Sequence, residues 1–234
     1  MSTYLFEPAP PVSVEVSGID ARFPVNRIFC VGRNYAAHVR EMGFDPEREE
    51  PCYFTKASRC IAESGSEIPY PPATQNYHHE IELVVAVGKA GFELSVDEAL
   101  SIVYGYACGL DMTRRDLQVA SRDSKGPWDI GKDFENSAVI SPIRPAEEIG
   151  HPASGRIQLA VNGELRQDSD LGHLIWSVPE IIAHLSRYYR LQPGDLIYTG
   201  TPDGVGPVEP GDRITGSVAA VGDISLTILG ESAA

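Results

Sequence analysis

The sequence predicts a strand-rich α+β fold built as a mixed β-sandwich roll, and three observations lead to this prediction. Apolar segments of strand length recur along the chain, and the segments with helical periodicity are short. Turns rich in Gly and Pro are dense in the last third, as in "QPGD" and "TGTPDGVGPVEPGD". Turns at this frequency argue against a regular doubly wound sheet.

The N-terminal part of the chain predicts an arm followed by one larger domain. Residues 1–22 should form an extended arm, because the prolines of "EPAPP" exclude a helix and "VSVEVSG" alternates like a short strand. The domain should cover residues 23–230. It should open with a strand over 26–32 and a helix over 34–43, for which Asn34 is a suitable N-cap and Gly43 a suitable stop. The charged segment 44–51 should be a loop.

The middle of the chain alternates strand and helix signals. "IELVVAVG" (81–88) and "YGYACGLD" (104–111) predict strands. Between them, Ser95 with Glu98 three residues later forms a capping-box pattern that opens a short helix over 95–103. Residues 112–123 predict another helix, with Thr113 near its start.

The later elements carry clearer signals. The alternation on both sides of an Asn-Gly pair in 157–167 predicts a β-hairpin. Residues 177–189 form the clearest amphipathic pattern, with Ile181, Ile182 and Leu185 on one side of the predicted helix. Short strands between tight turns should fill the remainder.

Composition limits the function. The 234 residues contain 19 basic and 33 acidic side chains, a formal charge of −14, which disfavours nucleic-acid and anionic-membrane partners. We find no signal peptide and no apolar run near the ~20 residues of a membrane span. The four cysteines (30, 52, 60 and 108) lack C-x-x-C spacing, which fits inert thiols in a cytoplasmic protein.

Three carboxylates suggest a metal site. Glu80 and Glu82 are two residues apart in a predicted strand, so they project from one face, where their charges would repel unless a cation lies between them. Asp111 ends another apolar strand. An oxygen-only site of this kind suits Mg²⁺ or Mn²⁺, and the same donors also suit Ca²⁺. The alternative is that Glu80 and Glu82 form the solvent face of a half-buried strand.

A second group of residues suggests acid–base chemistry. His38 and Glu41 would be neighbours on one helix face, and a carboxylate beside an imidazole supports a general base. The alternative is a surface pair without a role. Arg33, Lys56, Arg115 and Lys132 could supply the positive charge that an acidic substrate requires, although each could also be a surface charge. The glycines of "YTGTPDGVGP" could aim backbone N–H groups at an anion or could form a tight turn.

Taken together, "VGRNYAAHVREMG", "HHEIELVVAVG", "GYACGLDMTRRDLQ", "GPWDIGKDF", "VNGELRQ" and "YTGTPDGVGP" resemble the fumarylacetoacetate hydrolase (FAH) family, in particular its fumarylpyruvate hydrolase branch. The resemblance implies a mixed β-roll of the FAH C-terminal-domain type and a homodimer. It also implies Mg²⁺ or Mn²⁺ on the residues matching Glu80, Glu82 and Asp111, and a water-activating dyad on those matching His38 and Glu41. Further implied site residues are Arg115, Gln118, Lys132 and Thr201, and Arg33 is a substrate-binding candidate because of its positive charge. One departure is Ala57, where the family pattern has Pro after Lys56.

The activity that the resemblance implies is metal-dependent hydrolysis of a carbon–carbon bond in a 2,4-diketo acid. 3-Fumarylpyruvate, an intermediate of aromatic (gentisate) catabolism, is the expected substrate, with fumarate and pyruvate as products. His38 would act as the base, and Lys132 or Gln118 would hold the oxyanion or keep the substrate in place. The alternatives are an acylpyruvase or an oxaloacetate decarboxylase of the same family, isomerisation or decarboxylation of a longer oxo-dioate, and a non-catalytic ligand-binding relative.

Overall fold

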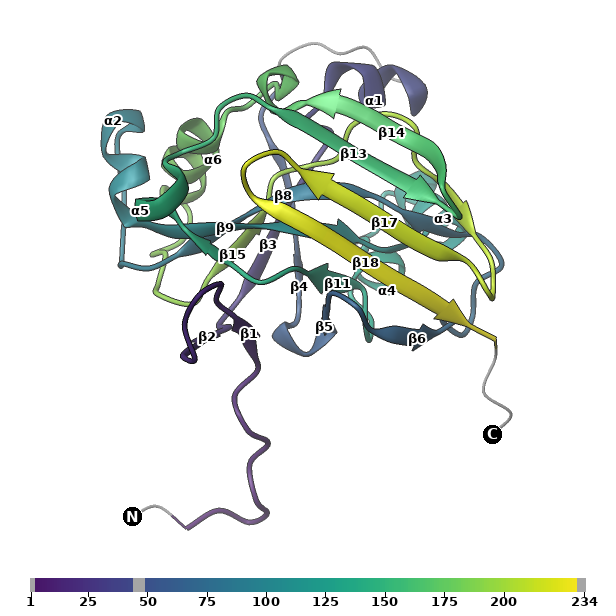
Figure 1. The fold of residues 1–234 in the computed structure, drawn as a ribbon, viewed down its shortest axis with the longest axis horizontal. Coiled ribbons are helices and arrows are strands. Elements are labelled where there is room, and N and C mark those ends of the chain that lie inside the picture. The colour runs from purple at the N-terminus through teal and green to yellow at the C-terminus, as the bar shows by residue number, and fades with distance from the viewer. Residues whose placement is uncertain (1–2, 44–48, 231–234) are drawn as a thin grey trace.

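A computed structural model describes residues 3–43 and 49–230 and confirms the strand-rich α+β fold (Figure 1). Most of the loop predicted at 44–51 lies outside the described residues. The larger of two main sheets has eight strands in the order β4-β3-β15-β8-β9-β11-β5, with β12 also pairing with β9. These strands are β3 (Ile28–Gly32), β4 (Cys52–Lys56), β5 (Ile61–Glu63), β8 (Ile81–Val87), β9 (Val103–Asp111), β11 (Ala138–Ile140), β12 (Arg144–Pro145) and β15 (Leu196–Tyr198).

The second main sheet has five strands in the order β14-β13-β17-β18-β6. They are β6 (Glu67–Pro69), β13 (Arg156–Val161), β14 (Glu164–Asp170), β17 (Arg213–Val218) and β18 (Gly222–Leu229). The predicted Asn-Gly hairpin is confirmed as β13–β14. Asn162 and Gly163 have φ values of 53° and 83°, and positive φ at both central residues is what a tight type I′ turn requires.

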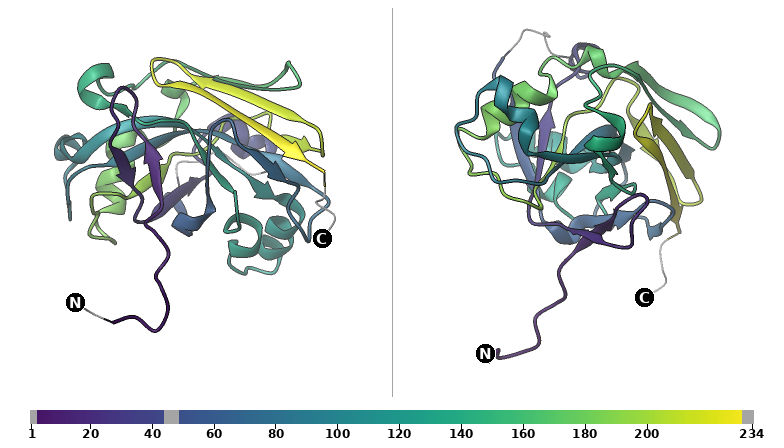
Figure 2. Two further views of the ribbon diagram at one scale, coloured as in Figure 1. Left: turned by 60° about the horizontal axis from the view of Figure 1, so that its bottom comes forward. Right: turned by 60° about the vertical axis from the view of Figure 1, so that its left-hand side comes forward.

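Two small sheets complete the fold. One contains β10 (Thr113–Arg114), β7 (Tyr77–His79) and β16 (Gly206–Val208), and the other is the pair β1 (Ser13–Glu15) and β2 (Arg22–Pro24). Figure 2 shows residues 3–11 leading away from the body of the protein, and all of them are exposed. The β1–β2 pair is anchored, because Val14 and Phe23 belong to one buried cluster on the larger sheet.

The core explains why β8 is apolar along its whole length. Leu83 and Val85 belong to the main cluster, which also contains Ile214 of the five-stranded sheet. Val84 and Ala86, which point the opposite way, belong to the cluster under β1 and β2. With both faces covered, a charged residue in this strand must have a polar partner in the interior.

The helices are short. They are α1 (Ala36–Glu41), α2 (Val96–Ala99), α3 (Arg115–Asp123), α4 (Asp129–Lys132), α5 (Ala146–Ile149) and α6 (Val178–Leu185), with 3₁₀ turns at Ser58–Cys60, Leu100–Ile102 and Leu171–His173. The predicted capping box of α2 is confirmed: the backbone N–H of Ser95 donates to Glu98 over 3.0 Å, and Ser95 Oγ accepts from the backbone N–H of Glu98 over 3.3 Å. Among the described residues no helix has the length and apolar character needed to cross a membrane.

Two local predictions about helix starts are wrong. The N-cap of α1 is Tyr35, without a side-chain hydrogen bond, and not Asn34. The buried amide of Asn34 instead donates to the carbonyls of Trp176 and Thr199, over 2.9 and 2.8 Å, and thereby ties distant segments together. Thr113 lies in β10, before the start of α3. In both cases tertiary and strand contacts take precedence over a local cap.

Candidate metal and active site

Three carboxylates meet where β8 and β9 lie side by side. Glu80 immediately precedes β8, Glu82 is its second residue, and Asp111 ends the antiparallel neighbour β9. The backbone N–H of Asp111 donates to the carbonyl of Glu80 over 2.9 Å, which fixes the alignment. One oxygen from each carboxylate lies within 4.8 Å of the others, and no member is more than 4% exposed. The alternative that Glu80 and Glu82 form a solvent face is therefore wrong.

Buried cations surround two of these carboxylates. Lys132 Nζ lies 2.8 Å from Glu80 Oε2 and 2.6 Å from Asp111 Oδ2. Arg115 forms an ion pair with Glu80, and Lys56 Nζ lies 2.9 Å from Asp111 Oδ1. Burial alone would raise the pKa of Glu80, but the charges of Lys132 and Arg115 outweigh it and lower that pKa. Glu80 is therefore held as a carboxylate.

Glu82 is in a different electrostatic position. Its Oε2 accepts a hydrogen bond of 2.7 Å from the backbone N–H of Gly200. Burial, followed by the charges of Asp111 and Glu80, raises the pKa of Glu82 well above its ordinary value. Gly200 has a φ of 99°, and a Cβ there would lie 2.7 Å from the side chain of Asn34, so glycine is required.

These features fit a divalent metal ion. A cation among the three carboxylates would compensate the charge that burial makes unfavourable at Glu82. All donors are carboxylate oxygens, the ligands preferred by Mg²⁺ and Mn²⁺. The residues present therefore suit the metal expected from the sequence.

His38 and Glu41 form the predicted pair on α1. His38 Nδ1 lies 3.0 Å from Glu41 Oε2, and Glu41 Oε1 accepts a 3.0 Å hydrogen bond from the backbone N–H of Gly204. Burial would raise the pKa of Glu41, but the hydrogen bonds from His38 and Gly204 outweigh it and lower that pKa. A carboxylate at Nδ1 favours the tautomer that donates from Nδ1 and leaves Nε2 as an acceptor.

The glycine-rich loop thus directs two N–H groups at anions, as the sequence suggested. The anions are the protein's own carboxylates, Glu82 at Gly200 and Glu41 at Gly204. One loop therefore positions both the metal-site carboxylate and the partner of His38.

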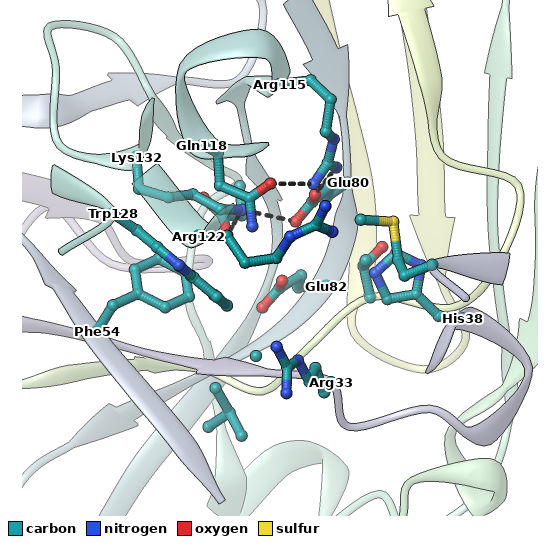
Figure 3. Close-up of a pocket in the computed structure, with 15 residues that line it drawn as sticks. Arg33, His38, Phe54, Glu80, Glu82, Arg115, Gln118, Arg122, Trp128 and Lys132 are labelled. Atoms are coloured by element: carbon teal, nitrogen blue, oxygen red, sulfur yellow. Dashed lines mark hydrogen bonds and ion pairs between the residues drawn. The ribbon is translucent and has the colours of Figure 1, made fainter. Parts of the chain in front are cut away.

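A single pocket joins the two groups (Figure 3). The pocket is partly open to solvent. Nine of the residues predicted for the site line it, namely Arg33, His38, Glu80, Glu82, Asp111, Arg115, Gln118, Lys132 and Thr201. Glu41 supports His38 from behind. The sequence analysis did not identify the other lining residues, which are Val31, Gly32, Met42, Phe54, Arg122 and Trp128.

The substrate-side residues are already organised by contacts within the protein. Arg115 Nη1 donates to Gln118 Oε1 over 3.1 Å, and Figure 3 shows the Gln118 amide nitrogen turned into the pocket. Thr201 Oγ1 accepts a 2.8 Å hydrogen bond from Gln167. The Nζ of Lys132 also donates to Thr113 Oγ1 over 2.7 Å.

Lys132 therefore has no spare donor in this arrangement. An ammonium group has three N–H bonds, and those of Lys132 reach Glu80, Asp111 and Thr113. The expectation that Lys132 holds a substrate oxyanion conflicts with this geometry, which instead suits the positioning of two carboxylates. Gln118 retains the donor that the oxyanion role requires.

Lys56 lies behind the pocket and is absent from its lining. Its Nζ reaches Asp111 and donates to Ser137 Oγ over 2.9 Å. A local hydrogen bond accounts for Ala57 at the position where the family pattern has Pro. The backbone N–H of Ala57 donates to Asp133 Oδ1 over 2.8 Å. Proline has no N–H and could not form this hydrogen bond.

The fold and the carboxylate site together define the class of protein. The family model "Fumarylacetoacetate (FAA) hydrolase C-terminal" matches residues 27–229, and the chain belongs to this family. A fumarylpyruvate hydrolase of Ralstonia sp is 54% identical over 184 residues, which cover 79% of this chain and 95% of that protein. The human mitochondrial oxaloacetate tautomerase FAHD1 is 44% identical over 200 residues, covering 86% and 89% of the two chains.

Solved structures agree with this assignment. The crystal structure of fumarylpyruvate hydrolase from Pseudomonas aeruginosa in complex with Mn²⁺ and pyruvate has a TM-score of 0.95 at 52% identity, covering 98% of this chain and 100% of that one. A structure described as a fumarylpyruvate hydrolase candidate from Burkholderia cenocepacia has a TM-score of 0.92 at 48% identity, covering 99% and 100%.

Proposed function

We propose that this protein is a metal-dependent hydrolase that cleaves 3-fumarylpyruvate into fumarate and pyruvate. The observation that carries the proposal is the meeting of a His38–Glu41 pair and a buried carboxylate triad in one pocket. The identity to a fumarylpyruvate hydrolase over 95% of that protein supports the choice of substrate. A merely ligand-binding relative would not need the His–Glu pair.

Glu80, Glu82 and Asp111 would hold Mg²⁺ or Mn²⁺, and Mn²⁺ is the ion named in the Pseudomonas aeruginosa structure. When bound, the ion supplies Lewis-acid stabilisation of the negative charge that develops on the departing pyruvate. Lys132 and Arg115 keep Glu80 ionised, and Lys132 and Lys56 hold the side chain of Asp111 in place.

His38 acts as the general base. Its Nε2 takes a proton from the water that attacks the ketone remote from the pyruvate end, and Glu41 stabilises the imidazolium that results. The amide N–H of Gln118 donates to the oxygen on which charge develops at that ketone. Cleavage of the carbon–carbon bond then releases fumarate, and a proton returns to the pyruvate carbon.

A direct assay tests this proposal. The purified protein with Mn²⁺ should cleave 3-fumarylpyruvate, and the loss of the substrate's diketo absorbance measures the rate. Removal of the Mn²⁺ with a chelator should abolish the reaction. His38→Ala should retain Mn²⁺ binding but lose about 10²- to 10⁴-fold in kcat. No cleavage by the metal-loaded wild type, or full activity in His38→Ala, would contradict the mechanism.

A second candidate is action on oxaloacetate, which the human relative's name supports. Oxaloacetate also carries a pyruvoyl end that the same carboxylate site could orient. The assay should also include oxaloacetate, maleylpyruvate and acetylpyruvate. It then separates hydrolysis of a diketo acid from tautomerisation of oxaloacetate and from decarboxylation of oxaloacetate, the alternative named in the sequence analysis. The cytoplasmic location and the homodimer belong to the proposal as well, and light scattering of the purified protein tests the dimer.

A further inference from the structure

Gln167 lies behind the pocket and joins three segments that build the site. It belongs to β14 of the five-stranded sheet, and its side chain is fully buried. Its Oε1 accepts from the backbone N–H of Ile81 over 3.0 Å, and Ile81 lies between the two glutamates of the carboxylate site. Its Nε2 donates over 2.8 Å to Thr201 Oγ1 and over 2.8 Å to the carbonyl oxygen of Pro202, both in the glycine-rich loop.

Two of these contacts fix which way the carboxamide of Gln167 points. The backbone N–H of Ile81 can only donate a hydrogen bond, and the carbonyl of Pro202 can only accept one. The amide oxygen must therefore face Ile81, and the amide nitrogen must face Pro202. His79 Nδ1 lies 3.1 Å from Oε1 and takes its second acceptor position, so all four hydrogen-bonding positions of the amide are used.

The fixed amide determines the polarity of the Thr201 hydroxyl. Thr201 Oγ1 faces an N–H of Gln167, so it accepts that hydrogen bond and must donate its own proton elsewhere. Within the described residues Thr201 forms no other side-chain hydrogen bond, and it lines the pocket at 3% exposure. Because a buried polar group is stabilised by a hydrogen-bond partner, this proton favours a ligand that brings an acceptor oxygen into the pocket.

We infer that Gln167 is a positioning residue that holds the Thr201 hydroxyl as a hydrogen-bond donor to an oxygen of the bound 2-oxo acid. This inference rests on the proposed function. A hydroxyl without this contact would have to be ordered when the ligand binds, which costs free energy that Gln167 removes in advance. Gln167 thereby makes this side of the pocket complementary to a carboxylate or keto oxygen and not to a hydrogen-bond donor.

A double-mutant cycle at saturating Mn²⁺ separates this role from a purely structural one. Gln167→Met keeps the approximate size but removes all four hydrogen bonds, and it should raise KM for 3-fumarylpyruvate and Kd for pyruvate about 3- to 10-fold. Thr201→Val should raise both constants about 10- to 100-fold, because a hydrogen bond to a charged ligand is lost. Adding Gln167→Met to Thr201→Val should change them by less than about twofold, whereas adding it to Thr201→Ser should again cost about 3- to 10-fold.

Calorimetric titration of the Mn²⁺-loaded proteins with pyruvate supplies the Kd values without turnover. Gln158→Met is the matched control, because Gln158 also donates to a hydroxyl, that of Ser217 over 3.1 Å, on the same sheet but away from the pocket. This control should leave both constants unchanged. If Gln167→Met does not fold, Gln167→Glu takes its place. Its carboxylate keeps the acceptor toward Ile81 but draws the Thr201 proton back, so it should weaken pyruvate binding more in the wild type than in Thr201→Val.

The outcomes separate the inference from the proposed function. A lower melting temperature of Gln167→Met with unchanged KM and Kd would show a structural role only and would overturn the inference. Equal losses with and without the Thr201 hydroxyl, or a wild type that binds no pyruvate, would also overturn it. A wild type that binds pyruvate but cleaves no diketo acid would instead overturn the proposed function, and the pyruvate titrations would still decide the role of Gln167.

Discussion

The backbone N–H of Gly204 donates a 3.0 Å hydrogen bond to Oε1 of Glu41, the carboxylate whose other oxygen holds His38. A loop between β15 and β16 thereby fixes the orientation of the proposed base on α1. Gly204 has a φ of 87°, and a Cβ there would lie 2.0 Å from the carbonyl oxygen of Arg166. The position therefore requires glycine for both backbone angle and space.

Gly204→Ala should for this reason damage catalysis through Glu41. The loop must move to clear Arg166, and the hydrogen bond to Glu41 is lost, so kcat should fall about 10- to 100-fold. Gly211→Ala is the matched control, because Gly211 has a similar φ of 96° but no atom within 4 Å of an added Cβ. Steady-state kinetics with melting temperatures compares the variants. Equal loss of activity in both would show that backbone strain, and not the Glu41 contact, is responsible.

Glu41 should also contribute a pH-dependent part of the stability. Its pKa is lowered in the folded protein, because the hydrogen bonds from His38 and Gly204 outweigh burial. The stabilisation is therefore complete above the unfolded pKa and is lost as pH falls through the lowered folded value. The melting-temperature difference between wild type and Glu41→Gln should be constant from pH 7 to about pH 5 and should shrink at lower pH.

Calorimetry from pH 7 to pH 3 measures this difference. Glu164→Gln, on the exposed side of β14, serves as the matched substitution and should follow the wild type throughout. A difference that grows with acidity would contradict the assigned role of the hydrogen bonds.

The sequence predicted those parts of the fold and site that depend on local rules. The side-by-side placement of Glu80 and Glu82 follows from strand alternation, and the contact of His38 with Glu41 follows from helical spacing. The capping box likewise depends only on Ser95 and Glu98, which are three positions apart in the sequence. Each of these contacts is made within one short segment, so the sequence of that segment is enough to predict it.

The remaining parts depend on which segments pack together. Arg122, Trp128 and Phe54 come from α3, from the residue preceding α4 and from β4, and no local pattern indicates that they share a pocket. Asn34 has the side chain of an N-cap but is recruited by Trp176 and Thr199, residues more than 140 positions away. Long-range contacts of this kind decide the substrate side of the site.

Lys132 should act on stability as well as on turnover. Lys132→Met leaves Glu80 and Asp111 buried without the ammonium group that lies 2.8 and 2.6 Å from them. Breaking a buried pair on one side costs about 3–5 kcal/mol, so the metal-free variant should melt well below the wild type. Mn²⁺ should raise its melting temperature by more than it raises that of the wild type, because the ion replaces a missing positive charge.

Lys89→Met, at an exposed position, is the control. An unchanged melting temperature with lost turnover would instead favour Lys132 as an oxyanion donor.

Glu82→Gln should have the opposite effect on the metal-free protein. Glu82 is 2% exposed, and burial with the charges of Asp111 and Glu80 raises its pKa, so its ionised form destabilises the fold above the unfolded pKa. The neutral amide removes that cost, and chelator-treated Glu82→Gln should melt above chelator-treated wild type at pH 7.

Saturating Mn²⁺ should stabilise the wild type by roughly 5–10 °C, as expected for ligand at about 100 times its Kd, and should leave the variant unchanged. Scanning calorimetry with EDTA and with Mn²⁺ tests both signs, with Glu67→Gln as an exposed control. An equal Mn²⁺ shift in wild type and Glu82→Gln would show that the ion binds elsewhere.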